Sequence, residues 1–164
     1  MKTTAISTNE AIVREAYRTA EVKDLKGFFS LFTDDGYFWD VSAGIKYYGN
    51  DVANPVDVYA RAFPDMHREL LQLFVKDDEN VVIVELTLNG THTGPLGVAG
   101  GGFIPPTNNK INAPCCDVWY LENGKIKKFH CYTAGTILLS QIGALSNLSA
   151  AIKQESQETV TATA

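Results

Sequence analysis

The sequence predicts an α+β fold, in which helices pack on one face of a strongly curved, cone-shaped antiparallel sheet. Apolar residues recur at helical spacing in the first 62 positions, whereas from position 67 to 132 they alternate with polar residues at the period of a strand. Helices followed by a run of strands form separate layers. A bent sheet closed by helices encloses a hollow with one open mouth, and such hollows commonly bind small molecules.

Length and charge set limits on the protein's class. The chain has 164 residues and a formal net charge of −5. We expect one domain over residues 1–146 and a polar tail over 147–164. The negative charge argues against nucleic acid or an anionic membrane as a partner. Because no apolar run approaches the roughly 20 residues of a membrane span and Met1–Ile6 lacks a signal-peptide pattern, we expect a cytoplasmic protein.

The first helix is predicted over residues 8–23. Ser7 precedes it and Glu10 follows three residues later, which is the pattern of a capping box. Apolar residues then follow at spacings that place them on one face of the helix: Ile12, Val13, Ala16, Tyr17 and Ala20.

Two shorter helices are predicted next. Asp24 has the character of an N-cap for a helix that runs through Phe32. The other begins near Pro55, since proline fits the first turn of a helix, and ends at Ala62 before Pro64.

One strand is predicted between these two helices. Residues 34–36 (Asp-Asp-Gly) have the composition of a turn, and the aromatic run over 37–41 has that of a strand. A loop over 44–49, bounded by glycines, then carries Tyr47 and Tyr48.

The second half of the chain predicts four more strands. They cover residues 67–75, 81–92, 110–121 and 125–132, and an Asn-Gly hairpin signal joins the last two. The segment 94–109 contains a triple glycine and a double proline, which predicts a long flexible loop of the kind that often forms a lid or a binding site. Residues 136–145 fit either a last strand or a short helix.

Three cysteines occur, at Cys115, Cys116 and Cys131. The odd number and the vicinal pair argue against a secreted disulfide framework. Their spacing fits no zinc template, and we interpret them as small buried apolar side chains. The sequence therefore predicts no metal site, and it contains no phosphate-binding or nucleophile-elbow motif that would indicate a cofactor.

Asp117 is the strongest candidate for a catalytic residue. A carboxylate buried among apolar side chains either raises its pKa or finds a partner. A carboxyl with a raised pKa exchanges protons near neutral pH, which suits general acid–base catalysis. The alternative is a structural Asp that faces solvent or binds a turn. The other members of its strand face are all apolar: Ile111, Ala113, Cys115, Trp119 and Leu121.

His92 ends an apolar strand face and is followed by the glycine-rich segment, where a pocket could open. It could act as a general base or an orienting donor, or it could be a histidine satisfied within the core. The other members of that face are Val82, Val84, Leu86, Leu88 and Gly90.

Further residues are candidates to line the same hollow and bind substrate. Asp40 lies beside Trp39, His67 begins a strand, and His130 lies on the partner strand of Asp117. The alternatives are that Asp40 caps a turn, that His67 forms an ion pair with Glu69 at the rim, and that His130 packs near the sheet end. An aromatic wall would come from Trp39, Trp119, Phe63, Tyr47, Tyr48 and Phe103, although such residues are more often plain core.

Five short motifs occur in order along the chain. They are Ala62–Glu69 (AFPDMHRE), Gly90–Gly94 (GTHTG), Pro105–Thr107 (PPT), Asp117 followed by Gly124–Ile126 (GKI), and Leu138–Gly143 (LLSQIG). In this order they resemble the SnoaL-like polyketide cyclases, over residues 8–145. The resemblance implies the nuclear transport factor 2-like α+β barrel, a cone that agrees with the predicted layers.

The resemblance also implies a function. Polyketide cyclases of this family close a ring by intramolecular aldol condensation, without a cofactor or metal. Asp117 matches their general acid/base, and His92 matches a pocket residue thought to assist. The expected partner is a small apolar molecule that contains a carbonyl group.

A more distant resemblance is to ketosteroid isomerase. Asp24–Gly27, Leu31–Asp35 and Asp40 keep the spacing that leads to the general-base Asp of that enzyme. Asp117 would then take the place of its protonated oxyanion-binding Asp, while Tyr17 falls about one position from its helix Tyr. Whether Asp40 or Asp117 is the main base stays open.

The chain departs from the family around the expected pocket. Lys128–His130 stand where a Glu-His-Trp triplet is common, Tyr120 stands where a basic residue is frequent, and the loop over 94–105 is longer. The substrate class therefore stays open. A dehydratase is an alternative, as is an epoxide hydrolase, although the latter usually needs an Arg between two carboxylates and none is evident near Asp117.

A non-catalytic binding or assembly module on the same fold is the remaining alternative. By analogy with the fold, we also expect a homodimer or homotetramer that forms through an exposed face of the sheet.

Overall fold

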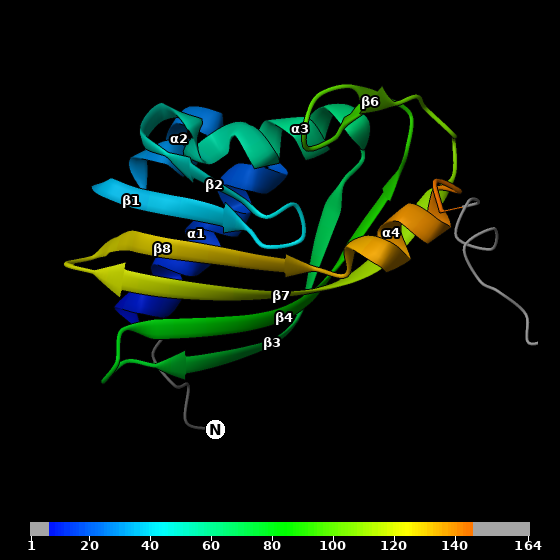
Figure 1. Ribbon diagram of the computed structural model, residues 1–164. Coiled ribbons are helices and arrows are strands. Elements are labelled where there is room, and N and C mark those ends of the chain that lie inside the picture. The colour runs from blue at the N-terminus through cyan, green and yellow to red at the C-terminus, as the bar shows by residue number, and fades with distance from the viewer. Residues whose placement is uncertain (1–6, 146–164) are drawn as a thin grey trace, which may run out of the picture.

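The computed structural model describes residues 7–145 and has the α+β architecture that the sequence predicts (Figure 1). The predicted tail over 147–164 lies outside the described residues. No helix within 7–145 combines the length and the apolar character needed to cross a membrane. The helices of this range are α1 (Thr8–Glu21), α2 (Leu25–Ser30), the short 3-10 helix η1 (Gly49–Ala53), α3 (Asn54–Ala62) and α4 (Gly135–Gln141).

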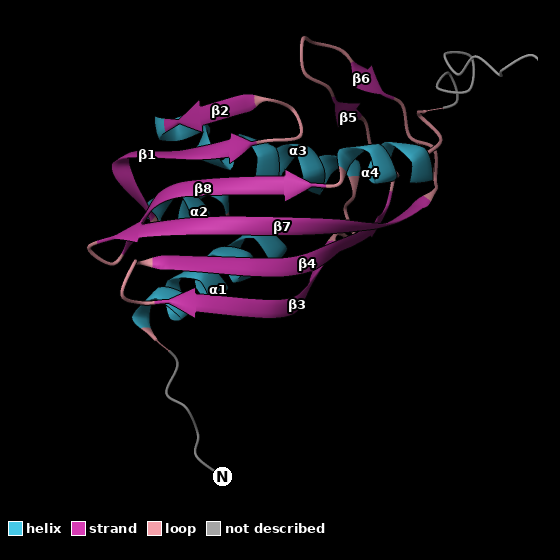
Figure 2. Ribbon diagram, turned by 60° about the horizontal axis from the view of Figure 1, so that its bottom comes forward, coloured by secondary structure: helices cyan, strands magenta, loops and turns pink. Residues whose placement is uncertain are grey.

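One curved sheet of six strands, in the order β2-β1-β8-β7-β4-β3, forms the second layer (Figure 2). Its strands are β1 (Phe32–Asp40), β2 (Ile45–Tyr48), β3 (His67–Lys76), β4 (Val81–Thr91), β7 (Lys110–Glu122) and β8 (Lys125–Thr133). All neighbours pair antiparallel except β1 and β8, so the prediction of a purely antiparallel sheet is wrong at this pair. The parallel pairing is possible because the long connection between them contains α3 and most of the other strands.

Helices α1, α2 and α3 all lie on one face of the sheet, whereas no helix of the described residues covers the other face (Figure 2). Helix α1 begins as predicted, because the Ser7 hydroxyl accepts a hydrogen bond from the backbone N–H of Glu10 at 3.1 Å. It ends at Glu21, two residues before the predicted end, since Lys23 takes a left-handed φ of 60° that a helix cannot continue.

The predicted turn at residues 34–36 lies inside β1 instead, and α2 ends before Phe32. β1 pairs with β8 on both sides of this segment, through Phe32 with Ile126 and Tyr37 with Lys128, and the register is irregular between the two pairs. A bulge therefore absorbs the turn-like residues, because pairing with β8 continues beyond them.

Two predicted loops contain short strands. The segment 44–49 includes β2, which pairs antiparallel with the edge of β1. The segment 94–109 includes β5 (Leu96–Gly97) and β6 (Phe103–Ile104), which pair as a separate two-stranded hairpin beyond α3. The open choice over 136–145 is settled as a helix, α4, which packs against β7.

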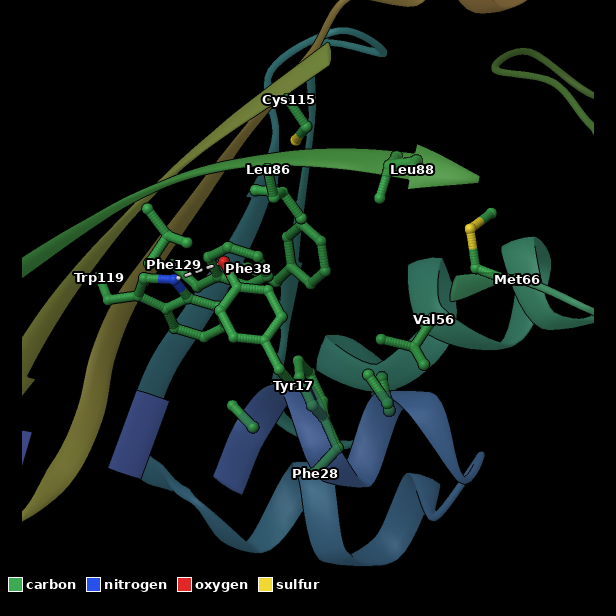
Figure 3. Packing of buried hydrophobic residues seen from close by; sticks show 14 of the residues in the cluster. Tyr17, Phe28, Phe38, Val56, Met66, Leu86, Leu88, Cys115, Trp119 and Phe129 are labelled. Carbon is green, nitrogen blue, oxygen red and sulfur yellow. Dashed lines mark hydrogen bonds between the residues drawn. The ribbon is translucent and has the colours of Figure 1, made fainter. Parts of the chain in front are cut away.

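The core lies between the concave face of the sheet and the three helices (Figure 3). The rings of Trp119 and Phe129 stack with centroids 3.6 Å apart, and Phe38 from β1 packs against Phe129 at 4.3 Å. Tyr17 of α1 approaches Trp119 edge-on, at 5.4 Å. These rings form a rigid aromatic cluster, because close packing between neighbouring strands and a helix leaves them few alternative positions.

Candidate active site

Asp117 lies on the concave face of β7, as its strand alternation predicts, and is 3 % exposed. The Tyr17 hydroxyl donates a hydrogen bond to Asp117 Oδ2 at 2.7 Å. The Cys115 thiol is its neighbour on the same face, with Sγ 3.4 Å from Oδ1. One carboxylate oxygen is therefore held by a strong donor, while the other meets only a weak one.

Burial raises the pKa of Asp117 to about 6, because an apolar surrounding disfavours the charged form. The hydrogen bond from Tyr17, the two thiols nearby and the positive charge of Arg68 oppose this rise. Burial and the adjacent carboxylate also raise the pKa of Tyr17 well above its usual value. The Trp119 indole N–H donates to the Tyr17 oxygen at 3.2 Å, so a relay of donors runs from Trp119 through Tyr17 to Asp117.

A hollow opens in front of this carboxyl, with an empty volume of about 540 Å³ that includes the solvent at its mouth. Most of its wall is apolar or aromatic, and its charged groups are Asp117, Asp40 and Arg68. The wall residues from the helices are Ala16, Tyr17, Ala20, Phe28, Pro55, Val56 and Tyr59, and those from the sheet include Phe38, Leu86, Leu88, Trp119, Phe129 and Thr133.

Asp40 lies at the end of β1 and lines the same hollow as Asp117. Its Oδ1 accepts a hydrogen bond from the backbone N–H of Ala43 at 3.0 Å, so it also caps the turn after β1. Burial raises its pKa, and the backbone N–H groups of Ala43 and Ser42 partly offset that rise. Asp40 also lines a second hollow, whose wall includes Leu96 of β5, so it borders both spaces.

Arg68 corrects the expectation that no Arg lies near Asp117. It projects from β3 into the wall of the hollow and its side chain is 13 % exposed. Its guanidinium lies 3.8 Å from the carboxylate of Glu21, which holds it at the rim. The hollow therefore contains one fixed positive charge between the helix layer and the sheet.

His92 is fully buried but is not among the residues that line the hollow of Asp117. Its ring packs against Phe63 at 5.2 Å, and its Nδ1 lies 3.1 Å from the hydroxyl of Thr107. Burial lowers its pKa, and its Nε2 has no hydrogen-bond partner among the described residues. In this position His92 anchors the segment after β6, because its backbone also bonds Thr107 and Asn109.

Three of the predicted wall residues, Trp39, Tyr48 and His130, lie on the opposite face of the sheet. His130 Nε2 lies 2.9 Å from the Tyr37 hydroxyl, and its ring lies 5.1 Å from that of Trp39. Tyr48 packs on Tyr37 and is 55 % exposed. The expectation that they line the hollow is corrected, because successive residues of a strand point to opposite faces.

The predicted homodimer or homotetramer through this face stays a prediction.

The remaining predicted residues divide between the rim, the core and the wall. His67 lies at the rim, with its side chain 64 % exposed and its Nδ1 2.7 Å from Glu21 rather than paired with Glu69. Phe63 is fully buried between Tyr59 and His92, outside the lining of the hollow. Trp119 lines the hollow as predicted.

Tyr17 and Arg68 lie beside Asp117 or in the same wall but are not among the predicted site residues. The helix periodicity predicts Tyr17 as a core residue, and the distant resemblance to ketosteroid isomerase places it about one position from the helix Tyr of that enzyme; in the structure it hydrogen-bonds a residue 100 positions away. Arg68 lies between His67 and Glu69, which the sequence indicates as rim residues. Because side chains alternate along a strand, Arg68 points to the opposite face from both, and this alternation could have identified it as a residue of the hollow.

The model of the SnoaL-like domain family matches residues 13–129, which is more than half of the chain. The chain belongs to the SnoaL-like family. No curated protein sequence matches it at a significant level.

Solved structures confirm the fold of this SnoaL-like domain. A candidate SnoaL-like polyketide cyclase from Jannaschia sp. CCS1 superposes with a TM-score of 0.71 at 17% identity, over 88% of this chain and 98% of that one. IdmH from Streptomyces antibioticus, a candidate polyketide cyclase, gives 0.66 at 17%, over 84% and 99%. A protein with the ketosteroid isomerase-like fold from Catenulispora acidiphila, in complex with trimethylamine, gives 0.66 at 15%, over 80% and 92%.

Proposed function

We propose that this SnoaL-like domain catalyses cofactor-free proton transfer on a small apolar carbonyl compound, with intramolecular aldol ring closure as the reaction. The observation that carries the proposal is the buried carboxyl of Asp117, which faces an apolar hollow and has a pKa raised to about 6. A carboxyl of this kind accepts and returns a proton near neutral pH without a metal or cofactor.

In the proposed reaction the Asp117 carboxylate removes a proton from the carbon next to a carbonyl group. The resulting enolate carbon attacks a second carbonyl carbon of the folded substrate, and the new alkoxide takes the proton back from Asp117. The hydrogen bond from Tyr17 to Oδ2 fixes the orientation of the carboxyl and leaves Oδ1 to meet the substrate. The apolar walls keep water from the enolate and favour a compact substrate conformation.

A second candidate function is isomerisation, in which Asp40 is the base. Two observations favour it: Asp40 and Asp117 line one hollow, and Tyr17 and Asp117 are joined by a hydrogen bond of 2.7 Å. In that reaction Asp40 moves a proton from one carbon to another, while protonated Asp117 donates a hydrogen bond to the enolate oxygen and Tyr17 keeps its hydrogen bond to Asp117 Oδ2.

Exchange of the α-protons of α-tetralone in D₂O, followed by ¹H NMR, tests the proposal, since an apolar ketone exchanges these protons through its enolate. We expect Asp117→Asn to slow exchange about 10²–10⁴-fold, the usual contribution of a general acid or base. Asp78→Asn is the matched control, because Asp78 is an exposed turn residue with a side chain that is 77 % exposed.

The Asp40→Asn variant separates the two candidate functions. A modest loss in Asp40→Asn beside a large loss in Asp117→Asn supports Asp117 as the base, whereas the reverse order supports isomerase chemistry. Exchange that is no faster with wild-type protein than in buffer contradicts both and favours a non-catalytic binding module.

A further inference from the structure

Three potential ligand atoms converge in the wall of the hollow, beside Asp117 Oδ1 and not the Oδ2 atom that Tyr17 holds. Cys115 Sγ lies 3.6 Å from Cys131 Sγ and 3.4 Å from Asp117 Oδ1. All three ligand atoms lie within 4.8 Å of one another. Cys115 and Cys131, like Asp117, line the hollow, so the cluster has access to small solutes.

The pairing of two strands brings this cluster together. Cys115 and Asp117 are two positions apart on β7 and therefore share a face. Cys131 on β8 is the direct cross-strand partner of Asp117. The spacing of the cysteines along the chain could not reveal this cluster, because the contact depends on the register between β7 and β8.

We propose that Cys115, Cys131 and Asp117 form a binding site for a thiophilic divalent cation such as Zn²⁺. Zinc bonds of about 2.3 Å to sulfur and about 2.0 Å to oxygen, at tetrahedral angles, separate two sulfurs by about 3.8 Å and a sulfur from an oxygen by about 3.5 Å. The Sγ–Sγ separation of 3.6 Å and the separation of 3.4 Å between Cys115 Sγ and Asp117 Oδ1 match these values, and Cys131 Sγ lies within 4.8 Å of the carboxylate. The fourth position is left to water or to a small ligand in the hollow.

Groups around the cluster are placed to support an ion. The Tyr17 hydroxyl holds Asp117 through Oδ2 rather than Oδ1, and so orients the carboxylate as an outer-shell donor does. The Thr133 hydroxyl lies 3.6 Å from Cys115 Sγ and 3.3 Å from Cys131 Sγ. Two thiolates and a carboxylate would give Zn²⁺ a net charge of −1, which the charge of Arg68 in the same wall balances.

The same geometry argues against a disulfide between the two cysteines. Cys115 pairs with Thr133 and Cys131 pairs with Asp117, so the cysteines are diagonal neighbours. Diagonal positions on paired strands stand about 7–8 Å apart, beyond the roughly 4.4–6.8 Å between the Cα atoms of a disulfide. An ion bridges a longer span than an S–S bond, because it adds two metal–sulfur bonds between the side chains.

Binding would release the thiol protons, so affinity should rise with pH. It would also occupy Asp117 Oδ1, and the ion should therefore suppress any proton transfer by that carboxyl. The site itself does not depend on the proposed function, since its evidence is the position of three ligand atoms.

Titration of the reduced protein with Co²⁺, which replaces Zn²⁺ in tetrahedral sites, tests the proposal by absorption spectroscopy. We expect one equivalent to give a thiolate-to-cobalt charge-transfer band with the visible bands of a tetrahedral site, and Zn²⁺ to remove both. Cys115→Ser and Cys131→Ser should each abolish the band, and Asp117→Asn should weaken binding. Cys116→Ser is the matched control, because Cys116 follows Cys115 on β7 but points to the other face of the sheet.

The absence of a band at one equivalent would overturn the proposal, as would loss of the band in Cys116→Ser or its survival in both other serine variants. Near-UV circular dichroism of the metal-free variants shows whether each one folds. If one of the two serine variants does not fold, the other still tests the site. A Cys115–Cys131 disulfide, found by mass spectrometry after air exposure, would contradict the diagonal geometry. The spectrum needs no turnover, so a failed proton-exchange assay does not affect this test.

Discussion

The two faces of the sheet are built from the same strands but form different chemical environments. Trp39 and Asp40 are neighbours on β1, yet Trp39 packs on His130 outside, whereas Asp40 lines the hollow inside. His130 and Cys131 on β8 divide in the same way. On the inner face helices exclude water and burial raises the pKa of Asp117, while the outer face is aromatic, partly exposed and open in the described structure. The direction of a side chain, more than its type, therefore decides its role here.

The two tryptophans give the largest expected contrast between the faces. Trp119 is 1 % exposed, stacks on Phe129 and donates to Tyr17, whereas Trp39 is half-buried on the outer face. Trp119→Ala should lower the free energy of unfolding by about 3–5 kcal/mol, because it leaves a cavity in the core. Trp39→Ala should cost about 1 kcal/mol. Urea unfolding followed by far-UV circular dichroism measures both, and equal losses would contradict the contrast.

The pH dependence of stability should report the buried carboxyl of the inner face. The pKa of Asp117 is about 6 in the folded, metal-free protein and near 3.8 when unfolded. Because the folded pKa is raised, the protonated acid favours folding at low pH, and this contribution is lost as pH rises from about 4 through 6. Wild type should lose on the order of 2–3 kcal/mol relative to Asp117→Asn across that range, measured by urea unfolding with a chelator present.

Asp65 supplies a control of opposite sign for this pH dependence. It is exposed, and hydrogen bonds from the backbone and hydroxyl of Thr91 lower its pKa. A lowered folded pKa contributes stability above the unfolded value, and that stability is lost as pH falls through the folded pKa. Asp65→Asn should therefore reduce the stability of wild type at neutral pH more than at low pH, and a slope of the same sign for both carboxyls would refute their assignment to different environments.

The hydroxyls of Tyr17 and Tyr37 compare one hydrogen bond on each face. Tyr17→Phe removes the donor to Asp117 and should cost about 1–2 kcal/mol, because it leaves a buried carboxylate with weaker partners. Proton exchange slows at low pH as Asp117 becomes protonated, and Tyr17→Phe should shift this decline to higher pH, since the charged form of Asp117 loses its main donor. Tyr37→Phe, which removes the partner of His130, should cost about 0.5 kcal/mol and leave the pH of this decline unchanged. Identical pH profiles of exchange for the two variants would show that Tyr17 does not lower the pKa of Asp117.

The sequence predicts the parts of this fold that depend on local periodicity. The order of helices and strands, the capping of the first helix by Ser7 and the inward face of Asp117 all follow from spacings of two to four residues. It could not predict the parallel pairing of β1 with β8, or the strand that absorbs residues 34–36, because these depend on a neighbour far along the chain.

The same limit explains the errors at the candidate site. Trp39 and Asp40 are adjacent on β1 and so cannot both face the hollow, and which of the two does so is set by the pairing of β1 with β8. The contact of Tyr17 with Asp117 joins a helix to a strand, and no spacing within either element reveals it. Residue types could be recognised as reactive from the sequence, but their grouping is set by tertiary packing.

The smallest expected effect concerns the cation on the outer face. Lys46 Nζ lies 4.9 Å from the ring of Trp39 and 5.0 Å from that of Tyr37, and it is exposed. Lys46→Met keeps most of the aliphatic chain but removes the charge, so the loss should be about 0.5 kcal/mol, the value of an exposed cation–π contact. Burial, and in part the charge of Lys46, lowers the pKa of the neighbouring His130, so the comparison must isolate Asp117. Because the sheet and its core separate Lys46 from the hollow, the change in free energy of unfolding between about pH 4 and pH 8 should differ between wild type and Asp117→Asn by the same amount with and without Lys46→Met. A shift in that difference on Lys46→Met would mean that the outer face influences the buried carboxyl, and the two faces could no longer be treated as independent.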